Sequence, residues 1–320
     1  MKFRVSLAAA AITAMGVMGA QAQQAKQLSI ATGGTGGVYY PLAGGFGSIL
    51  AKEIPGVTAT AEVTGGSVDN MKLIGAGNAD VAFTQVDTAV DAANGRDKFP
   101  KKLGIRALVV MYPNLMQVVT LEGNGITNFT DLKGKRLSTG APGSGTEIFA
   151  LRIIEAMGLD KDNDMSRERL SAAESGNALK DKKIDAFMFV AGVPTSAITD
   201  VAASPGMKML LVDHDQAVPK MVEKYGPSYA PTVIPKGSYP NQDKESKVAA
   251  TWNIMAVRDD FPEDLAYKLT KIMLEMREDL GKVHKEALNI KVENQKSQNA
   301  GIPWHPAALK YFAEKGIKVD

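Results

Sequence analysis

Residues 27–50, QLSIATGGTGGVYYPLAGGFGSIL, predict a strand, a glycine loop and a helix in direct succession. Residues 27–31 alternate polar and apolar side chains, as a half-buried strand does. The helix has one apolar face, formed by Leu42, Phe46, Ile49 and Leu50. Glycines before a helix let backbone N–H groups approach a ligand, and the helix N-terminus favours negative charge. An ordinary tight turn is the alternative, but four glycines and two adjacent tyrosines favour binding.

The same order of elements recurs in the middle of the chain. Residues 135–138 predict a strand, residues 139–145 (TGAPGSG) a loop, and residues 146–157 a helix with one apolar face. The sequence therefore predicts two α/β units of related construction. Other strands are expected at residues 57–64, 80–84, 106–111, 115–121, 184–190, 207–212 and 249–258.

The last part of the chain differs from the two units. A long helix is expected from Pro262, with a buried stripe reaching Leu280, and a final helix covers residues 306–314. A chain that builds one lobe, crosses to a second and returns predicts a hinged, two-lobed α/β binding protein. Two crossing segments, near residues 113–121 and 252–257, would form its hinge. One continuous sheet through both halves would argue against this placement.

The N-terminus predicts export and thereby sets the domain limits. Lys2 and Arg4 precede an uncharged apolar stretch, and Ala20-Gln21-Ala22 supplies the small residues of a cleavage site. The stretch is shorter than the roughly 20 residues of a spanning helix, so no membrane anchor is expected. We expect a signal peptide at 1–22, a first lobe at 23–116 plus 253–320, and a second lobe at 117–252. The mature protein would be free in the compartment to which it is exported.

Composition excludes several classes of protein. The chain has no cysteine, which excludes disulfides, thiol nucleophiles and cysteine metal sites. Of its 37 Lys and Arg residues, two lie in the predicted signal, which leaves 35 against 35 Asp and Glu. A neutral mature chain argues against nucleic acid as a partner. Neutrality does not decide the oligomeric state; we expect a monomer.

Four segments carry the candidate binding residues. The first two are the opening glycine loop and the segment 64–70, where helix capping alone is the alternative explanation. The other two are the loop 140–147 and a pair of strand ends, 83–87 and 190–195, which should face a cleft. Their candidate ligand-binding residues are Gly36, Gly37, Tyr39, Gly66, Ser67, Asn70, Thr84, Gln85, Gly143, Ser144, Gly145, Thr146, Gly192 and Pro194.

The loop 140–147 has the G-x-x-x-x-G spacing of a phosphate-binding loop, but it lacks that loop's chemistry. Thr146 stands where the lysine should be, and Glu147 stands where the magnesium-binding hydroxyl should be. What remains is a set of N–H donors and hydroxyls at a helix N-terminus, which suits a carboxylate. Ser144 is not a hydrolase nucleophile either, because Pro142 and Thr146 break the G-x-S-x-G pattern.

Catalytic and metal sites find little support in the sequence. No two of the three histidines have metal-binding spacing. His214, between two aspartates, is expected on the surface, and His305 is expected to be structural at a helix start. We expect no cofactor, no metal and no enzymatic activity. An exported enzyme and a ligand-sensing periplasmic protein on the same fold are the alternatives.

Taken together, these segments resemble the TAXI branch of solute receptors for tripartite ATP-independent periplasmic (TRAP) transporters. The resemblance spans almost the whole mature chain in family order. It rests on the opening glycine loop with Tyr39 and Pro41, Gly66-Ser67-Val68-x-Asn70, residues 79–85 (ADVAFTQ), Gly140-x-x-Gly143-Ser144-Gly145-Thr146, and residues 302–308 (IPWHPAA).

The resemblance implies an α/β fold of the periplasmic binding protein type II kind, with two lobes joined by a hinge. It also implies a periplasmic receptor that passes a small carboxylate, such as glutamate or 2-oxoglutarate, to TRAP membrane subunits for ion-driven uptake. Other TRAP receptors commonly hold the carboxylate with an arginine, but none of the four segments contains Arg or Lys. Backbone donors and helix N-termini would take its place. By carry-over, the two lobes would contribute Tyr39, Ser67, Asn70 and Gln85 from the first, and Gly143, Ser144, Gly145, Thr146 and Pro194 from the second.

Overall fold

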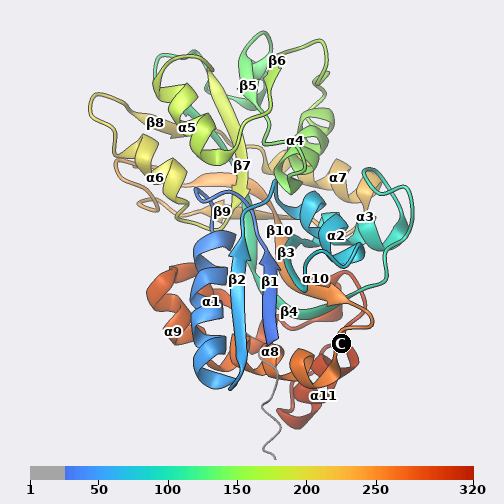
Figure 1. The fold of residues 1–320 in the computed structure, drawn as a ribbon. Helices are drawn as coiled ribbons and strands as arrows, with labels where there is room; N and C mark the ends of the chain where they lie inside the picture. The colour runs from blue at the N-terminus through green and yellow to red at the C-terminus, as the bar shows by residue number, and fades with distance from the viewer. Residues whose placement is uncertain (1–25) are drawn as a thin grey trace, which may run out of the picture.

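The computed structural model describes residues 26–320, so the predicted signal peptide at 1–22 lies outside the described residues. The chain forms two α/β lobes, one above the other in Figure 1. Among the residues described, the model contains no helix with the length and apolar character needed to cross a bilayer.

One lobe, called here the amino-terminal lobe, combines the first and last parts of the chain (Figure 1). Its strands are parallel where β1 pairs with β2 and β3. Its elements are β1 (Lys26–Ala31), α1 (Tyr39–Glu53), β2 (Val57–Glu62), α2 (Ser67–Gly75), β3 (Val81–Gln85), α3 (Val86–Asn94), α8 (Glu263–Glu275), α9 (Arg277–Val283), the 3₁₀ helices η3 (Lys285–Asn289) and η4 (Val292–Asn294), α10 (Ser297–Ala300) and α11 (Pro306–Glu314).

The other lobe, called here the middle lobe, is built from the middle of the chain. Its β5, β6 and β7 are parallel neighbours. Its elements are η1 (Phe129–Leu132), β5 (Arg136–Ser138), α4 (Gly145–Ala156), β6 (Ser166–Glu168), α5 (Ala172–Lys180), β7 (Ala186–Ala191), α6 (Ser196–Ala202), β8 (Met209–Leu211), η2 (Asp215–Ala217), α7 (Val218–Tyr225) and β9 (Ala230–Ile234).

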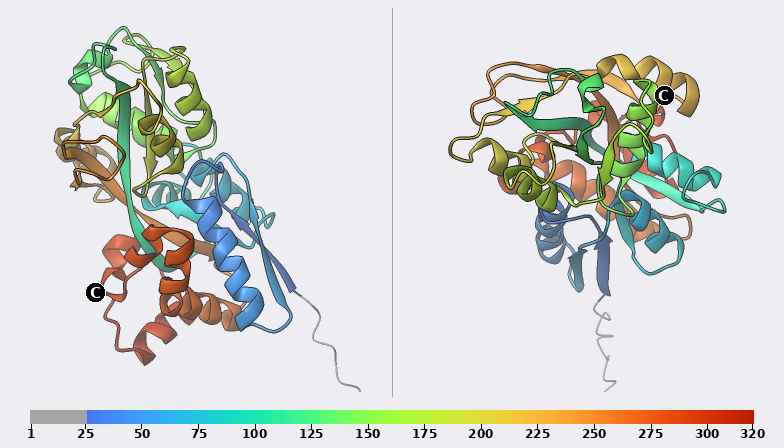
Figure 2. Two further views of the ribbon diagram at one scale, coloured as in Figure 1. Left: turned by 90° about the vertical axis from the view of Figure 1, so that its left-hand side faces the viewer. Right: turned by 90° about the horizontal axis from the view of Figure 1, so that it is seen from above.

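Two long strands, β4 (Ile105–Leu121) and β10 (Ser246–Arg258), belong to both lobes. Figure 2 shows them running from one lobe into the other. In the amino-terminal lobe β10 pairs with β3, whereas further toward its start it pairs with β9. Strand β4 pairs with β10 up to Leu115 and with β7 from Leu115 onward. The strands therefore change partners where the chain crosses between the lobes.

The strands form one continuous ladder, in the order β2-β1-β3-β10-β4-β7-β5-β6, with β8 on β4 and β9 on β10. The expectation that one continuous sheet would argue against the predicted crossings is therefore wrong. It failed because the crossing segments are themselves strands that pair with each other. A register shift between Trp252 and Ile254 adds local twist at this point. The predicted boundaries of the two lobes, 23–116 plus 253–320 for the first and 117–252 for the second, remain a prediction.

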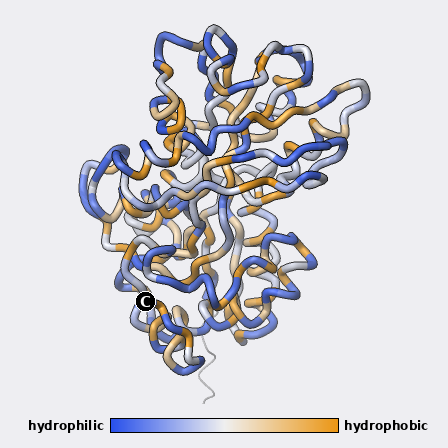
Figure 3. Tube along the Cα trace, turned by 180° about the vertical axis from the view of Figure 1, so that it is seen from behind, coloured by the Kyte–Doolittle hydropathy of each residue, from blue (hydrophilic) through white to orange (hydrophobic). Residues whose placement is uncertain are grey.

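Each lobe has its own buried apolar side chains. One large cluster joins strands β1 and β3 to helices α1, α8 and α11, and includes Phe46, Phe83 and Phe312. A second cluster lies around α4 and β7 in the middle lobe and includes Phe129 and Phe149. Figure 3 colours the chain by hydropathy: hydrophobic segments lie mostly along the inner strands, and hydrophilic segments lie mostly in the outer loops.

Three sequence expectations need correction. The strands expected at 106–111 and 115–121 are one strand, β4, because the polar residues between them stay in the ladder. The long helix from Pro262 ends at Glu275, since Met276 has a non-helical ψ of 20°, and α9 follows. His214 is fully buried rather than on the surface: its Nδ1 lies 2.9 Å from the Val212 carbonyl oxygen. Burial lowers the pKa of His214 to about 4.

Candidate functional site

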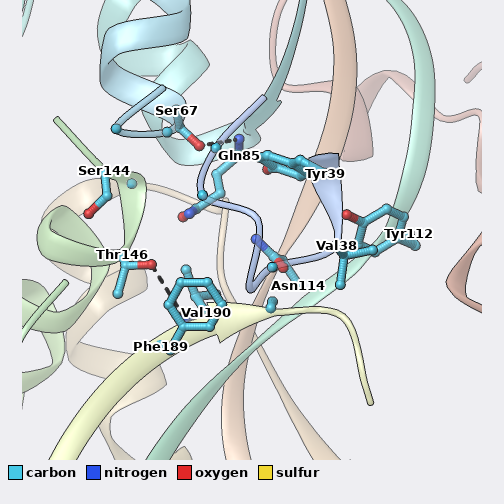
Figure 4. Close-up of a pocket in the computed structure, with 17 residues that line it drawn as sticks. Val38, Tyr39, Ser67, Gln85, Tyr112, Asn114, Ser144, Thr146, Phe189 and Val190 are labelled. Carbon is cyan, nitrogen blue, oxygen red and sulfur yellow. Dashed lines mark hydrogen bonds between the residues drawn. The ribbon is translucent and has the colours of Figure 1, made fainter. Parts of the chain in front are cut away.

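A small cavity lies between the lobes, beside the crossing strands. Its volume is about 60 Å³. Figure 4 shows side chains of both lobes converging on it, with Ser67 and Gln85 on one side and Ser144 and Thr146 on the other. The cavity is lined by Gly33, Gly34, Gly37, Val38, Tyr39, Gly65, Gly66, Ser67, Gln85, Tyr112, Asn114, Ser144, Gly145, Thr146, Phe189, Val190 and Ala191.

Four helices begin at this cavity. The residues that precede the first turns of α1, α2, α3 and α4 all line it: Val38, Gly66, Gln85 and Ser144. The first N–H groups of a helix have no partner within the helix, and the helix dipole adds partial positive charge there. Three of these helices belong to the amino-terminal lobe and one to the middle lobe. An anion in the cavity would thus be stabilised from both sides.

Among residues 26–320, no Asp, Glu, Lys, Arg or His lines the cavity. Its charge is therefore set by backbone dipoles and hydroxyl groups. Apolar side chains form the rest of the wall, with Phe189 of β7 the largest. A Cβ atom on Gly37 would lie 3.5 Å from Phe189 Cζ, so the opening glycine loop packs directly on this ring.

Three buried polar atoms of the lining have no hydrogen-bond partner within the described residues: Gln85 Oε1, Tyr112 Oη and Asn114 Oδ1. The side chains are at most 3% exposed. Buried polar groups are nearly always hydrogen-bonded, so these atoms are candidates for bonds to a ligand. The Tyr112 hydroxyl can donate to a carboxylate, whereas the two amide oxygens accept and would need an N–H or O–H group on the ligand. Burial also raises the pKa of Tyr112 well above its ordinary value, which keeps its hydroxyl proton in place as a donor.

Tyr39 lies beside this group but is already bonded. Its hydroxyl donates to Asn253 Oδ1 of strand β10, and Asn253 Nδ2 donates to the Tyr112 carbonyl oxygen at 3.1 Å. Burial raises the pKa of Tyr39. Its ring also stands edge-on to Phe83, with ring centroids 5.9 Å apart. Tyr39 therefore fixes the first helix to the crossing strand.

The two lobes touch closely around the cavity. A Cβ atom on Gly145 would lie 2.5 Å from Gln85 Nε2 and 2.9 Å from Ser67 Oγ. These distances are shorter than van der Waals contact, so this approach of α4 to the amino-terminal lobe requires glycine. The Asp69 N–H also donates to the Gly143 carbonyl oxygen at 3.1 Å. The structure thus has the lobes closed over the cavity.

Eight of the predicted binding residues line the cavity. Their side chains or backbone come from all three predicted glycine segments and from the end of β3. They are Gly37, Tyr39, Gly66, Ser67, Gln85, Ser144, Gly145 and Thr146. The Ser67 hydroxyl accepts from the Gln85 N–H at 3.1 Å, and the Thr146 hydroxyl accepts from the Val190 N–H at 3.5 Å.

Six predicted residues lie outside the lining, and most have a structural role instead. Asn70 is buried and donates to the carbonyl oxygens of Thr32 and Phe83. Thr84 is buried in β3, where its hydroxyl donates to the Gln85 carbonyl oxygen at 3.3 Å. Gly143 has a positive φ of 78° and forms the contact with Asp69.

The other three lie at contacts between the lobes. The carbonyl oxygen of Gly36 accepts from the Ala197 N–H at 3.3 Å and from Ser196 Oγ at 2.9 Å. A Cβ atom on Gly192 would meet Glu286 Cγ at 2.4 Å. Pro194 lies in the same loop, and its backbone is within hydrogen-bonding reach of His284 of the amino-terminal lobe. These residues therefore position the lobes rather than the cavity wall.

The sequence analysis missed Tyr112 and Asn114. Both lie in β4, between two apolar runs, and alternate with Pro113. Two polar side chains that interrupt a buried strand beside a proline were the available signal. The analysis also missed Phe189, because an aromatic residue inside a buried strand resembles ordinary core.

The histidines and acidic residues give no sign of a metal centre. Within residues 26–320, His, Cys, Asp and Glu form no group of three or more that could hold a metal ion. His305 has the structural role expected from the sequence: its Nδ1 accepts from the Ala307 N–H at 3.2 Å at the start of α11.

Comparison with known proteins places the fold. The model of the NMT1-like family matches residues 30–316. The periplasmic aliphatic sulphonate-binding protein SsuA of Escherichia coli is 13% identical, with 90% of this chain and 83% of that chain covered and a TM-score of 0.50. A protein of Bordetella bronchiseptica RB50 is 16% identical, with 90% and 88% covered and a TM-score of 0.52.

A third structure, solved with L-arginine bound, is 13% identical, with 82% of this chain and 90% of that chain covered and a TM-score of 0.51. At such low identity the likeness concerns the fold. It confirms the predicted class, a two-lobed α/β fold of the periplasmic binding protein kind.

Proposed function

Because the chain belongs to the NMT1-like family and has the fold of periplasmic binding proteins, we propose that it is the periplasmic solute receptor of a TRAP transporter of the TAXI type. It captures a small carboxylate between its lobes and passes it to the transporter's membrane subunits. Export by a cleaved signal, action as a monomer and the absence of enzymatic activity belong to the same proposal.

The observation that carries the proposal is a cavity that meets four helix N-termini and contains no charged side chain. A cation would lack a counter-charge there, whereas a carboxylate finds N–H donors without one. A phosphate-binding loop would need a lysine and a metal-binding hydroxyl, which Thr146 and Glu147 do not supply. The candidate site therefore favours a weakly charged anion.

The size of the cavity bears on which carboxylate is bound. An engineered cavity of about 150 Å³ holds one benzene molecule, and this cavity measures about 60 Å³. Acetate is smaller than benzene and comes nearest to the size of the closed form described here. Lactate and pyruvate have as many non-hydrogen atoms as benzene, so they would need a slightly wider cavity. Glutamate and 2-oxoglutarate are larger than benzene, so they would hold the lobes further apart.

Isothermal titration tests the proposal. The protein is unfolded and refolded to remove carried-over ligand, then titrated with acetate, lactate, pyruvate, C4-dicarboxylates, glutamate and 2-oxoglutarate. Because SsuA is described as a sulphonate-binding protein, methanesulphonate serves as a second anion class. Binding of at least one carboxylate, tighter than the sulphonate, is expected. Binding of none would contradict the proposal.

The membrane partner needs a test of its own. We propose the TRAP membrane subunits, on the resemblance of residues 66–70, 79–85 and 140–146 to TAXI receptors. Uptake of the bound acid into vesicles that contain those subunits should require the receptor and an ion gradient. Uptake that instead requires ATP would contradict this assignment, and binding without any uptake would favour a sensing role.

A further inference from the structure

A second contact between the lobes lies away from the cavity, along the same two helices that carry Gln85 and Ser144 at their starts. Arg152 of α4 meets Asp87 and Asp91 of α3 there, and Tyr229, just before β9, completes the group. The four residues are between 2% and 6% exposed. Such burial is unusual for charged side chains and calls for a reason.

The contacts join the two lobes side chain to side chain. Arg152 Nη2 donates to Asp91 Oδ2, and Arg152 Nη1 donates to the Tyr229 hydroxyl at 2.7 Å. The Tyr229 hydroxyl in turn donates to Asp87 Oδ2 at 2.9 Å. Asp87 Oδ2 also lies 3.9 Å from Arg152 Nη1. Arg152 and Tyr229 come from the middle lobe, whereas both aspartates come from the amino-terminal lobe.

The charges of this group depend on each other. Burial alone would lower the pKa of Arg152, but Tyr229, Asp87 and Asp91 raise it, so the guanidinium stays charged. Burial raises the pKa of Asp87, and Arg152 opposes that effect. If the lobes separate, water reaches all three charges and replaces the lost partners. Arg152 Nη2 also donates to Asp97 Oδ2 at 3.3 Å, and Arg96 Nε lies 3.3 Å from Asp91 Oδ1. If the lobes close without Arg152, Asp91 therefore keeps Arg96, whereas Asp87 is left buried without its cation.

We propose that Arg152, Asp87 and Asp91 form a latch that is completed only when the lobes close, and that this latch sets how slowly the ligand leaves. The latch rests on the proposed binding function but contacts no ligand. Because α3 and α4 also begin at the cavity, closing the latch brings Gln85 and Gly145 together around the ligand. These residues position the binding site.

Arg152→Met tests the latch, because it keeps an unbranched side chain that fills most of the aliphatic part of arginine and removes the charged guanidinium. Its dissociation rate for the tightest-binding acid, measured by stopped-flow, should rise at least tenfold, with a smaller change in the association rate. The matched control is Arg136→Met, which breaks an ion pair with Asp185 inside the middle lobe. The control should keep the wild-type dissociation rate.

A second variant shows whether a faster dissociation rate comes from the lost ion pair or from misfolding. Asp91→Asn keeps the shape of the contact and removes one charge. The double variant Arg152→Met, Asp91→Asn should raise the dissociation rate by less than the two single effects combined, because fewer charges remain unpaired. Wild-type dissociation rates in both single variants, each folded by its thermal transition, would overturn the latch.

A readout without ligand separates the latch from the proposed function. The chain has no cysteine, so spin labels at Lys72→Cys and Lys161→Cys, both exposed, report the distance between the lobes. Arg152→Met should shift this distribution to longer distances than wild type, and an unchanged distribution would overturn the latch. If wild type binds no carboxylate while the shift occurs, the proposed function fails and the latch stands.

Discussion

Helices α3 and α4 contact each other in two regions that differ in charge: the residues at their starts line an uncharged cavity, and residues further along form buried ion pairs. At their starts, Gln85 and Ser144 line a cavity without a single charged side chain. Further along, Asp87, Asp91 and Arg152 form a buried ion-pair group. Backbone dipoles are present whether the lobes are open or closed, whereas the ion pairs form only on contact. The difference assigns recognition of the ligand to the helix starts, and stabilisation of the closed form to the side chains behind them.

Magnitudes support this division. One helix N-terminus stabilises a nearby anion by about 0.3–1 kcal/mol, so four contribute roughly 1–4 kcal/mol. A dissociation constant of about 1 μM needs about 8 kcal/mol. The remainder has to come from hydrogen bonds to groups such as Tyr112, from apolar contact with Phe189, and from the closed state. A receptor with such a cavity therefore depends on closure for its affinity.

Adding a negative charge to the cavity should have the largest effect. Ser144→Asp keeps a good N-cap residue for α4 but places a carboxylate beside the ligand. Repulsion of about 3 kcal/mol, on the order of 100-fold in affinity, is expected at the effective dielectric of a protein surface. Calorimetric titration measures it. Ser144→Asn, a neutral cap of similar size, is the control, and unchanged affinity in the Asp variant would remove this loop from the site.

Blocking the approach of the lobes should have the next largest effect. Gly145→Ala places a methyl group 2.5 Å from Gln85 Nε2, and such overpacking costs about 1–3 kcal/mol. We expect affinity to fall roughly tenfold or more while the ligand-free protein keeps its melting temperature. Gly44→Ala, an exposed helical glycine with nothing within 4 Å, should leave affinity unchanged. Equal affinities for the two variants would mean that closure at Gly145 is not needed.

Removing one unpaired hydroxyl should have a moderate effect. Tyr112→Phe deletes a group with no partner in the described part of the chain, so stability should hold. A lost hydrogen bond of about 0.5–1.5 kcal/mol would weaken ligand binding several-fold. The contrasting variant is Tyr239→Phe, whose hydroxyl accepts from the Thr195 N–H at 3.0 Å and donates to Gln117. It should lower the melting temperature and spare the affinity; the reverse pattern would exclude Tyr112 from the site.

The smallest expected effect is that of pH on affinity. The titratable side chains that line the cavity are Tyr39 and Tyr112, and burial raises the pKa of both. Both therefore stay protonated through neutral and moderately alkaline pH. Affinity should be flat between about pH 6 and 9 and fall only where the ligand's own carboxyl group takes up a proton. A marked change between pH 6 and 9 would point to a charged group at the ligand.

Local patterns in the sequence predicted most of the elements. The strand at 27–31 and the helix at 146–157 agree with β1 and α4 within one residue at each end. The helix after the first glycine loop is α1, which continues three residues beyond the quoted stretch to Glu53. Eight predicted residues line the cavity because glycine loops at strand ends are local features that place backbone N–H groups directly. Asn70 and Thr84 lie outside the cavity lining, and capping and core hydrogen bonds call for the same residue types as ligand binding does.

Long-range pairing could not be predicted in the same way. Tyr112 and Asn114 reach the cavity only because β4 changes its partner from β10 to β7 at Leu115. The buried state of His214 depends on the chain around it, since two neighbouring aspartates favour a surface position. The group around Arg152 joins residues 61 positions apart, and its aspartates have the composition of an ordinary exposed helix. The group around Arg152 is buried because the two lobes pack against each other there.

One titration tests the central claim most directly. The tightest-binding acid and its neutral primary amide have nearly the same shape, so they differ in charge at one end. If helix N-termini recognise a carboxylate, the amide should bind at least tenfold more weakly under the same conditions, and Ser144→Asp should reduce that difference. Equal affinity of acid and amide in the wild-type protein would contradict the account.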